Sequence, residues 1–126
     1  PEDWVIATGK TTAVRDFVRM SFNQVGIELE FKGEGVYEKA FIKTCSNPDF
    51  QLPIGKEVLN VDPKYFRPTE VDLLIGDATK AKEKLGWVPK YDLPALVKDM
   101  MQSDVKLMKK EQYLKDGGYK IMNYFE

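Results

Sequence analysis

The sequence contains no histidine and only one cysteine, Cys45, among its 126 residues. The absence of histidine excludes Ser-His-Asp triads, Cys-His pairs, histidine zinc sites and imidazole general bases from this chain. A single cysteine cannot form an internal disulfide, which favours a reducing, cytoplasmic location. Because no histidine is available to activate the thiol, we interpret Cys45 as inert and not as a nucleophile.

An excess of charge of one sign and long hydrophobic runs are also missing. Lysine and arginine number 19 and aspartate and glutamate 20, which gives a formal net charge of -1. This balance provides no general electrostatic attraction to nucleic acids or membrane surfaces, and no apolar run is long enough to span a bilayer. Hydrophobic residues make up 43% of the chain and charged residues 31%, as expected for one globular domain.

Glycine-rich phosphate loops and a catalytic Tyr-Lys pair are absent. No G-x-G-x-x-G, G-x-x-G-x-x-G or Walker pattern follows a strand-like run, and no tyrosine has a lysine four positions later. We therefore predict no catalytic residue, no cofactor-binding residue and no metal ligand in this chain. The opening Pro1-Glu2-Asp3 lacks an initiator methionine, so we expect either a processed chain or the rear part of a longer protein.

The first third of the sequence predicts a strand, a helix and a second strand. The apolar run 4–8 predicts a short strand closed by Gly9. Thr11 and Thr12 offer an N-cap for a helix whose apolar positions recur at helical spacing until Gly26. Residues 27–32 alternate apolar and charged side chains, which is typical of a half-buried strand that ends at Gly33.

The middle of the sequence is the least regular part. From Gly33 to Lys56 the hydrophobic periodicity fades between scattered glycines and prolines, so we expect a long surface loop, either functional or disordered. Residues 57–61 then predict another strand.

The last third predicts two helices. Asp77 is placed to cap a helix from Ala78 to Leu85, and Gly86 is placed to end it. Asp92 is placed to cap a longer helix, and residues 110–126 are interpreted as a C-terminal surface extension whose aromatic side chains dock on a neighbouring surface. The longer helix carries an apolar stripe for packing at Leu93, Leu96, Val97, Met100, Leu107 and Met108.

The segment Asp62-Pro63-Lys64-Tyr65-Phe66-Arg67-Pro68-Thr69-Glu70-Val71-Asp72 is the first candidate site. Pro68 pushes Arg67 toward an extended conformation, so a stiffened backbone presents a guanidinium fork that suits phosphate. Glu70, three residues later, supplies a carboxylate that suits ribose hydroxyls. The alternative is a plain ion pair between Arg67 and Glu70.

Arg15 is the second candidate. In the first turn of the predicted helix its cation is disfavoured by the helix dipole, whereas a bound anion would favour it. An anionic ligand facing Gly9, Thr11, Thr12 and Arg15 is one reading of this pattern. The alternative is that Arg15 pairs with Asp16, that Arg19 is merely solvated and that Gly9 only turns the chain.

Several stretches resemble a known family. Residues 77–89 are similar to the D-x-[ST]-K-A-x-x-x-L-G-W-x-P signature of extended short-chain dehydrogenase/reductases that act on nucleotide sugars. Within that superfamily the chain resembles the GDP-mannose 4,6-dehydratases, over nearly its whole length. The stretches that carry this narrower resemblance are 5–9, 13–18, 31–35 and 61–72, the last containing the specific element D-P-[KR]-Y-[FY]-R-P-[TA]-E-V.

The resemblance implies an α/β fold and a division of labour. This chain would be the C-terminal substrate-binding lobe of an extended Rossmann-type enzyme, with mixed short strands and helices. The N-terminal Rossmann domain, which in the family binds NADP and carries the catalytic residues, would lie outside it. Position by position, Arg67 would clamp the diphosphate of GDP-mannose and Glu70 would hold the ribose hydroxyls. Arg15 would be a further substrate ligand, with Ala13 in place of the family's serine.

The implied activity belongs to the whole enzyme. The family is a lyase that makes GDP-4-keto-6-deoxy-mannose by NADP-dependent internal oxidoreduction and loss of water, on the route to GDP-fucose, so the lobe alone would be inactive. Its partners would be GDP-mannose, the N-terminal domain of the same enzyme and further copies in a homodimer or homotetramer. Two alternatives stay open: another nucleotide-sugar dehydratase, epimerase or reductase, and a non-catalytic nucleotide-sugar-binding module.

Overall fold

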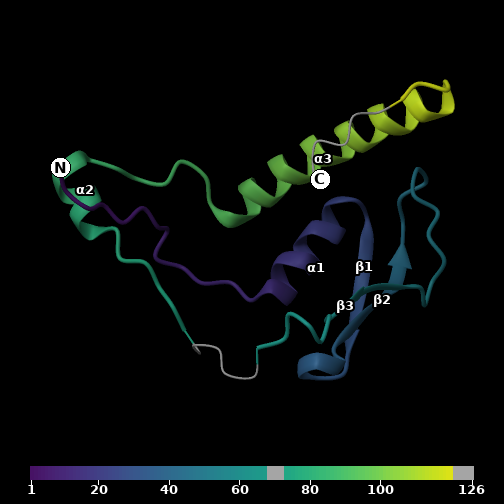
Figure 1. The fold of residues 1–126 in the computed structure, drawn as a ribbon, viewed down its shortest axis with the longest axis horizontal. Helices are drawn as coiled ribbons and strands as arrows, with labels where there is room; N and C mark the ends of the chain where they lie inside the picture. Colours follow the sequence, from purple (N-terminus) through teal and green to yellow (C-terminus); the bar gives the residue numbers. More distant parts are fainter. Residues whose placement is uncertain (68–72, 121–126) are drawn as a thin grey trace.

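The computed structural model describes residues 1–67 and 73–120, and within them it has an α/β architecture (Figure 1). In chain order the elements are α1 (Val14–Gln24), β1 (Ile27–Lys32), a 3-10 turn η1 (Gly35–Tyr37), β2 (Lys39–Cys45), β3 (Glu57–Asn60), α2 (Thr79–Leu85) and α3 (Leu93–Asp116). None of the helices in these described ranges is long and apolar enough to cross a membrane.

The three strands form an antiparallel sheet in the order β1-β2-β3. Leu29 pairs with Ile42 and Phe31 with Ala40, which places alternate apolar side chains of neighbouring strands on one face. Four apolar side chains of β1 and β2 are buried and form the main core. Val18 and Phe22 of α1, and Val25 directly after α1, pack against it. The core residues are Ile27, Leu29, Ala40 and Ile42.

β2 is the central strand, and the sequence pattern does not predict it. We predicted a loop from Gly33 to Lys56, but this segment contains η1 and β2, and Ala40 and Ile42 are among the most buried residues of the chain. The apolar run here is short, lies between charged residues and has glycines and prolines on both sides, so its periodicity is weak. Pairing with β1 on one side and β3 on the other decides the outcome, because β propensity depends strongly on context.

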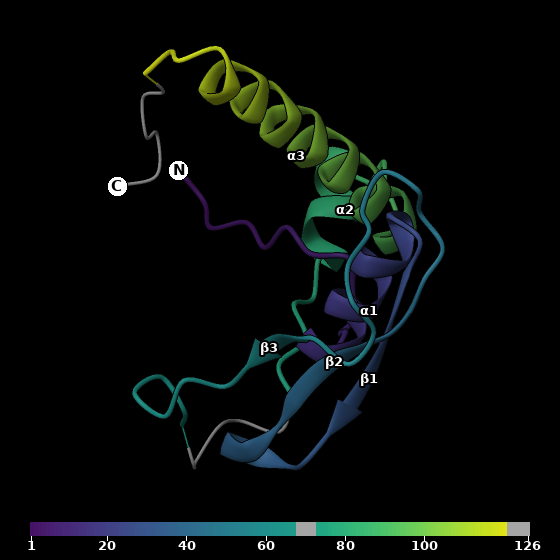
Figure 2. The ribbon, with the colours of Figure 1, turned by 90° about the vertical axis from the view of Figure 1, so that its right-hand side faces the viewer.

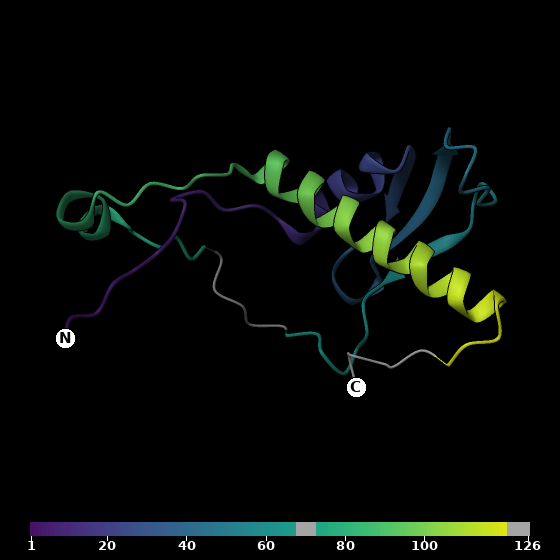
Figure 3. The ribbon, with the colours of Figure 1, turned by 90° about the horizontal axis from the view of Figure 1, so that it is seen from above.

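α1 contacts both β1 and α3, so it joins the long helix to the sheet (Figure 3). The predicted helix is confirmed, but its N-cap is Ala13 without a side-chain hydrogen bond, and neither Thr11 nor Thr12 caps it. Val97 of α3 is fully buried. The covered side of α3 runs at steps of four residues, through Leu93, Val97, Met101 and Val105.

One prediction about α3 is corrected by this packing. Leu96, Met100 and Met108, which the spacing placed in the packing stripe, are exposed by 44%, 43% and 51%. α3 continues through Asp116, so residues 110–116 of the expected extension are helical. Its predicted cap is confirmed, since Asp92 Oδ1 accepts a hydrogen bond of 2.9 Å from the Ala95 N–H.

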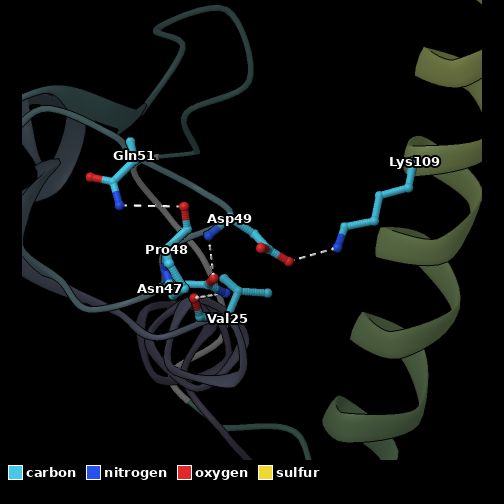
Figure 4. Close-up of polar contacts among 6 residues, drawn as sticks. All are labelled: Val25, Asn47, Pro48, Asp49, Gln51 and Lys109. Carbon is cyan, nitrogen blue, oxygen red and sulfur yellow. Dashed lines mark hydrogen bonds and ion pairs between the residues drawn. The ribbon is translucent and has the colours of Figure 1, made fainter.

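The loop after β2 ties α1 to α3 (Figure 4). Asn47 Nδ2 donates to the Val25 carbonyl at 3.0 Å, and the Asp49 N–H donates to Asn47 Oδ1 at 2.9 Å. Lys109 Nζ of α3 then donates to Asp49 Oδ2 at 3.0 Å and lies 5.4 Å from the centre of the Phe50 ring. The part of the predicted loop that follows β2 is therefore held in place by specific contacts.

α2 and the first residues of the chain lie together at the end of the molecule away from the sheet (Figures 1 and 3). Lys80 Nζ lies 3.1 Å from Glu2 Oε2, donates to the Asp3 carbonyl at 3.0 Å and sits 4.7 Å from the centre of the Trp4 ring. The predicted strand at 4–8 is wrong, because these residues are irregular and pass beside Gly76 without a strand ladder. A strand needs a neighbour that accepts and donates along its whole length.

The predicted helix after Asp77 is confirmed one residue later than expected. α2 begins at Thr79, whose N–H donates to Asp77 Oδ1 at 2.9 Å and whose hydroxyl donates to the same oxygen at 2.5 Å. These bonds lower the pKa of the Asp77 carboxyl. Gly86 ends the helix in the left-handed conformation, as the sequence indicated.

Candidate functional site

A cavity of about 730 Å³ lies where the start of α1, the end of η1 and the segment after β3 meet. That segment projects beyond the sheet (Figure 2). Arg67, one of the three predicted site residues, lines the cavity. Arg15, a second one, is bonded to Glu38, which also lines it. Its walls are formed by Val14, Gly35, Glu38, Val61, Lys64, Tyr65, Phe66 and Arg67.

Two glycines give η1 the shape that brings Glu38 to this cavity. Gly33 has a φ of +84°, and a Cβ there would lie 2.4 Å from the Tyr37 carbonyl oxygen, so no larger residue fits without a shift. Gly35 has a φ of +57°, and a Cβ added there would lie 3.6 Å from Cζ of the Phe66 ring. The tight turn therefore lets the chain after β3 approach and places Glu38 opposite the first turn of α1.

Arg15 and Glu38 form an ion pair at the edge of the cavity. Arg15 Nε donates to Glu38 Oε1, and the exposed fractions of the two side chains are 49% and 16%. The hydrogen bond from Arg15 lowers the pKa of the Glu38 carboxyl although its partial burial acts in the opposite direction. The same bond raises the pKa of Arg15, so both groups are charged at neutral pH.

The alternative pairing proposed for Arg15 is wrong. Asp16 accepts instead from Arg19 Nη1 at 2.5 Å, three residues along the same helix. Arg19 is therefore not merely solvated, and its guanidinium also lies 5.2 Å from the centre of the Phe31 ring. Sequence spacing alone favoured the nearest carboxylate, whereas the fold supplies Glu38 from a distant turn.

Lys64 and Tyr65 also line the cavity, although the sequence did not indicate them as site residues. Asp62 Oδ1 accepts from the Lys64 N–H at 2.9 Å, and the Asp62 carbonyl accepts from the Tyr65 N–H at 3.0 Å. This is the turn that an aspartate followed by proline favours. The Asp62-Pro63 pair was the available signal, because it predicts a turn that exposes the two residues after it.

Arg67 is the last described residue before a gap, and it lines the cavity. Glu70, the predicted ribose ligand, and Pro68, the predicted brace, lie outside the described residues. The proximity of Arg67 and Glu70, and the choice between a ligand site and a plain ion pair, therefore stay predictions.

The chemistry of the cavity suits an anion with an attached ring. Arg67, Lys64 and the adjacent Arg15 supply positive charge, and Glu38 is the carboxylate among the lining residues. Guanidinium groups bind phosphate oxygens in a planar, two-pronged arrangement. Tyr65 and Phe66 add apolar ring faces, with Tyr65 74% exposed. The N-terminus of α1, at Val14, adds the positive end of a helix dipole.

Gly9 does not line the cavity of Arg67. It lines a different cavity, of about 400 Å³, together with Ala7, Gly76 and the start of α2. An anion site shared by Gly9, Thr11, Thr12 and Arg15 therefore stays a prediction. Within residues 1–67 and 73–120, no cluster of histidine, cysteine, aspartate and glutamate side chains has the arrangement of a metal site.

Comparison with known proteins gives a consistent match along the chain. Residues 1–100 match the family described as GDP-mannose 4,6 dehydratase. The chain is similar to GDP-mannose 4,6-dehydratases of Yersinia enterocolitica and Vibrio cholerae, with 46% and 44% identity over 122 residues, or 96% of this chain and 33% of each relative. A human GDP-mannose 4,6 dehydratase is 44% identical over 109 residues, which cover 86% of this chain and 27% of the relative. The chain thus spans between about a quarter and a third of the length of these curated relatives.

Proposed function

This chain belongs to the GDP-mannose 4,6-dehydratase family, and on that basis we propose that it is the substrate-binding part of such an enzyme. The whole enzyme is a lyase that converts GDP-mannose to GDP-4-keto-6-deoxy-mannose. Residues 1–126 form its C-terminal lobe, which holds GDP-mannose, and the region 110–126 extends that lobe. The chain alone is inactive in this proposal because it carries no proton-transferring or hydride-transferring machinery.

One observation carries the assignment of the site. The cavity of about 730 Å³ places Arg67 and Lys64 near the Arg15–Glu38 pair, although these residues come from separate parts of the sequence. Arg67 clamps the diphosphate, Glu70 accepts from the ribose hydroxyls, and Arg15 supports the anionic part of the ligand. Because a diphosphate needs several donors within a few ångströms, a cluster of cations at one cavity fits it better than dispersed surface charges.

The contribution of this lobe to catalysis is positioning. Interactions with the nucleotide, remote from the reacting hexose carbons, hold the sugar against the catalytic groups of the enzyme. NADP supplies the hydride chemistry when it is bound. This chain offers it no glycine-rich phosphate loop, so NADP belongs to an N-terminal Rossmann domain of the extended short-chain dehydrogenase/reductase type. That domain, a homodimeric or homotetrameric assembly and a cytoplasmic location complete the proposal.

The test of the proposed function uses the complete gene product that carries this sequence. We expect turnover of GDP-mannose in the presence of NADP, and no comparable turnover of UDP- or dTDP-sugars. Calorimetric titrations with GDP-mannose and with NADP give the two affinities separately. Turnover of another nucleotide sugar in place of GDP-mannose would reassign the substrate, and binding without any turnover would favour a non-catalytic binding module.

Arg67→Ala in the same protein is expected to raise KM for GDP-mannose strongly and to leave NADP affinity nearly unchanged, because its guanidinium serves the substrate diphosphate. Arg19→Ala is the matched control, since Arg19 is another exposed arginine and does not line the cavity. Equal losses of substrate and NADP affinity would contradict the assignment. For Glu70→Gln the expected loss falls on ribose-containing ligands, so an equal loss for GDP and inorganic pyrophosphate would remove its proposed role.

A further inference from the structure

We propose that Glu38 is a positioning residue that fixes the Arg15 guanidinium for the anionic part of the nucleotide ligand. This inference rests on the proposed function and adds to it a residue that the sequence did not suggest. Glu38 acts through Arg15 and makes no contact of its own with the ligand.

The geometry of the pair leaves Arg15 able to bind. Its Nε carries the hydrogen bond to Glu38 Oε1, and the guanidinium has two further nitrogens with four N–H donors. Because the group is planar, a bond at Nε fixes the plane in which those donors point. About half of the Arg15 side chain is exposed, compared with 16% of Glu38. The carboxylate is thus the covered partner and the guanidinium the accessible one.

Arg15 needs such a partner because of its place in α1. It lies in the first turn of the helix, where the positive end of the dipole disfavours a cation. Without a partner, a long, flexible arginine in that position would turn its charge toward solvent and would lose conformational entropy when it binds a ligand. The carboxylate of Glu38 offsets the dipole and holds the side chain in one orientation before the ligand arrives.

Glu38 itself is held by the fold. It directly follows η1, where its N–H donates to the Gly35 carbonyl at 3.2 Å, and it directly precedes β2. Its neighbour Lys39 pairs with Glu57 Oε2 of β3 at 2.8 Å, on the same sheet. The carboxylate therefore stands on a rigid element, as a positioning group requires.

The main experiment is a double-mutant cycle in the complete gene product, with Arg15→Ala, Glu38→Gln and the combination. We expect Glu38→Gln to raise KM for GDP-mannose on the order of tenfold, with a smaller change in kcat, because a charge-assisted hydrogen bond is lost. The double variant should resemble Arg15→Ala alone, since Glu38 has no role once Arg15 is gone. Additive effects of the two changes would overturn the inference.

A ligand comparison separates positioning from simple stabilisation of the fold. Calorimetry with GDP and with guanosine should show that Glu38→Gln weakens GDP binding and leaves guanosine binding unchanged. Glu57→Gln is the matched control, because it removes a carboxylate from the Lys39–Glu57 pair on the same sheet and should leave GDP affinity unchanged. Equal losses for GDP and guanosine, or an unchanged GDP affinity in Glu38→Gln, would refute the role.

The outcomes also distinguish this inference from the proposed function. If the unmodified protein neither turns over GDP-mannose nor binds GDP, the proposed function fails. If it does both, and Arg15→Ala weakens GDP binding while Glu38→Gln does not, only the positioning role fails.

Discussion

Two parts of this chain solve the problem of burying apolar surface in different ways. The sheet unit, residues 14–60 and 93–116, encloses its own core, with Ile42 and Val97 exposed by 1% and 0%. The α2 unit, residues 1–9 and 73–89, buries Ala81 but leaves Leu74 and Val88 exposed by 78% and 62%. The α2 unit therefore has a defined local structure although much of its apolar surface is exposed to solvent.

The difference shows what holds each unit together. In the sheet unit, apolar packing between strands and helices supplies most of the stability. In the α2 unit, Lys80 joins Glu2 and Trp4 by an ion pair and a cation–π contact, which are individually weak at a surface. Its exposed apolar side chains fit the proposal that the rest of a larger enzyme covers them.

We expect the largest effect on stability from a substitution in the core of the sheet unit. Ile42→Ala should lower its free energy of unfolding by about 2–5 kcal/mol, because it removes buried methyl groups and leaves a cavity. Far-UV circular dichroism during urea unfolding measures this, and the fluorescence of Trp4 and Trp87 reports on the α2 unit in the same samples. Ile54→Ala is the control, since Ile54 is 74% exposed. If the urea midpoints from circular dichroism and from fluorescence shift equally, the two units unfold as one cooperative unit and the difference between them is refuted.

The next effect sharpens the account of the turn before β2. Gly33→Ala should cost more than about 1–2 kcal/mol, because a left-handed backbone and a clash with the Tyr37 carbonyl act together. Gly55→Ala is the matched control, since Gly55 has a similar φ of +83° but no atom within 4 Å of an added Cβ. Urea unfolding of both variants gives the comparison. Identical losses would mean that the turn relaxes around the new methyl group.

A smaller effect is expected at the start of α3. Asp92→Ala removes the acceptor of the Ala95 N–H and should reduce the stability of the sheet unit by about 1 kcal/mol. Asp99→Ala, within the same helix, should change it much less because it removes no cap. Thermal unfolding followed by circular dichroism suffices. A loss in Asp99→Ala as large as that in Asp92→Ala would argue against capping as the cause.

The smallest effect concerns the α2 unit. Lys80→Ala should cost less than about 1 kcal/mol, because its partners lie at the surface, but it should release the first residues from α2. Tryptophan fluorescence and limited proteolysis near the N-terminus report this release. Lys84→Ala is the control, since Lys84 Nζ lies 3.9 Å from Glu2 Oε2, whereas the cation–π contact with the Trp4 ring comes from Lys80. Indistinguishable behaviour of the two variants would assign the attachment to other contacts.

Regular elements with local signals were predictable from the sequence. The alternation at 27–32 predicts β1, and Asp92 and Gly86 mark a helix start and a helix end that the structure confirms. These signals succeed because capping and periodicity act between residues close in sequence. The ends of the elements were less predictable, because packing and not local preference sets how far α3 extends.

Elements and contacts that depend on distant residues were not predictable. β2 was missed because its identity comes from pairing with two neighbouring strands, and the run at 4–8 was called a strand although it has no strand ladder. At the site, the sequence indicated Arg67 and Arg15 as ligand residues, and these two assignments stay predictions. It did not indicate Glu38 as the partner of Arg15, because no local pattern connects residues in a helix and a distant turn.

The order of the strands has a consequence for how the chain is made. β1, β2 and β3 are consecutive and each pairs with the next, so the sheet closes only short loops and has a low contact order. During synthesis this meander can pair while α3 is still inside the ribosome. Until Val97 emerges and α3 docks, α1 can cover the sheet, but the side of α1 that contacts α3 stays uncovered.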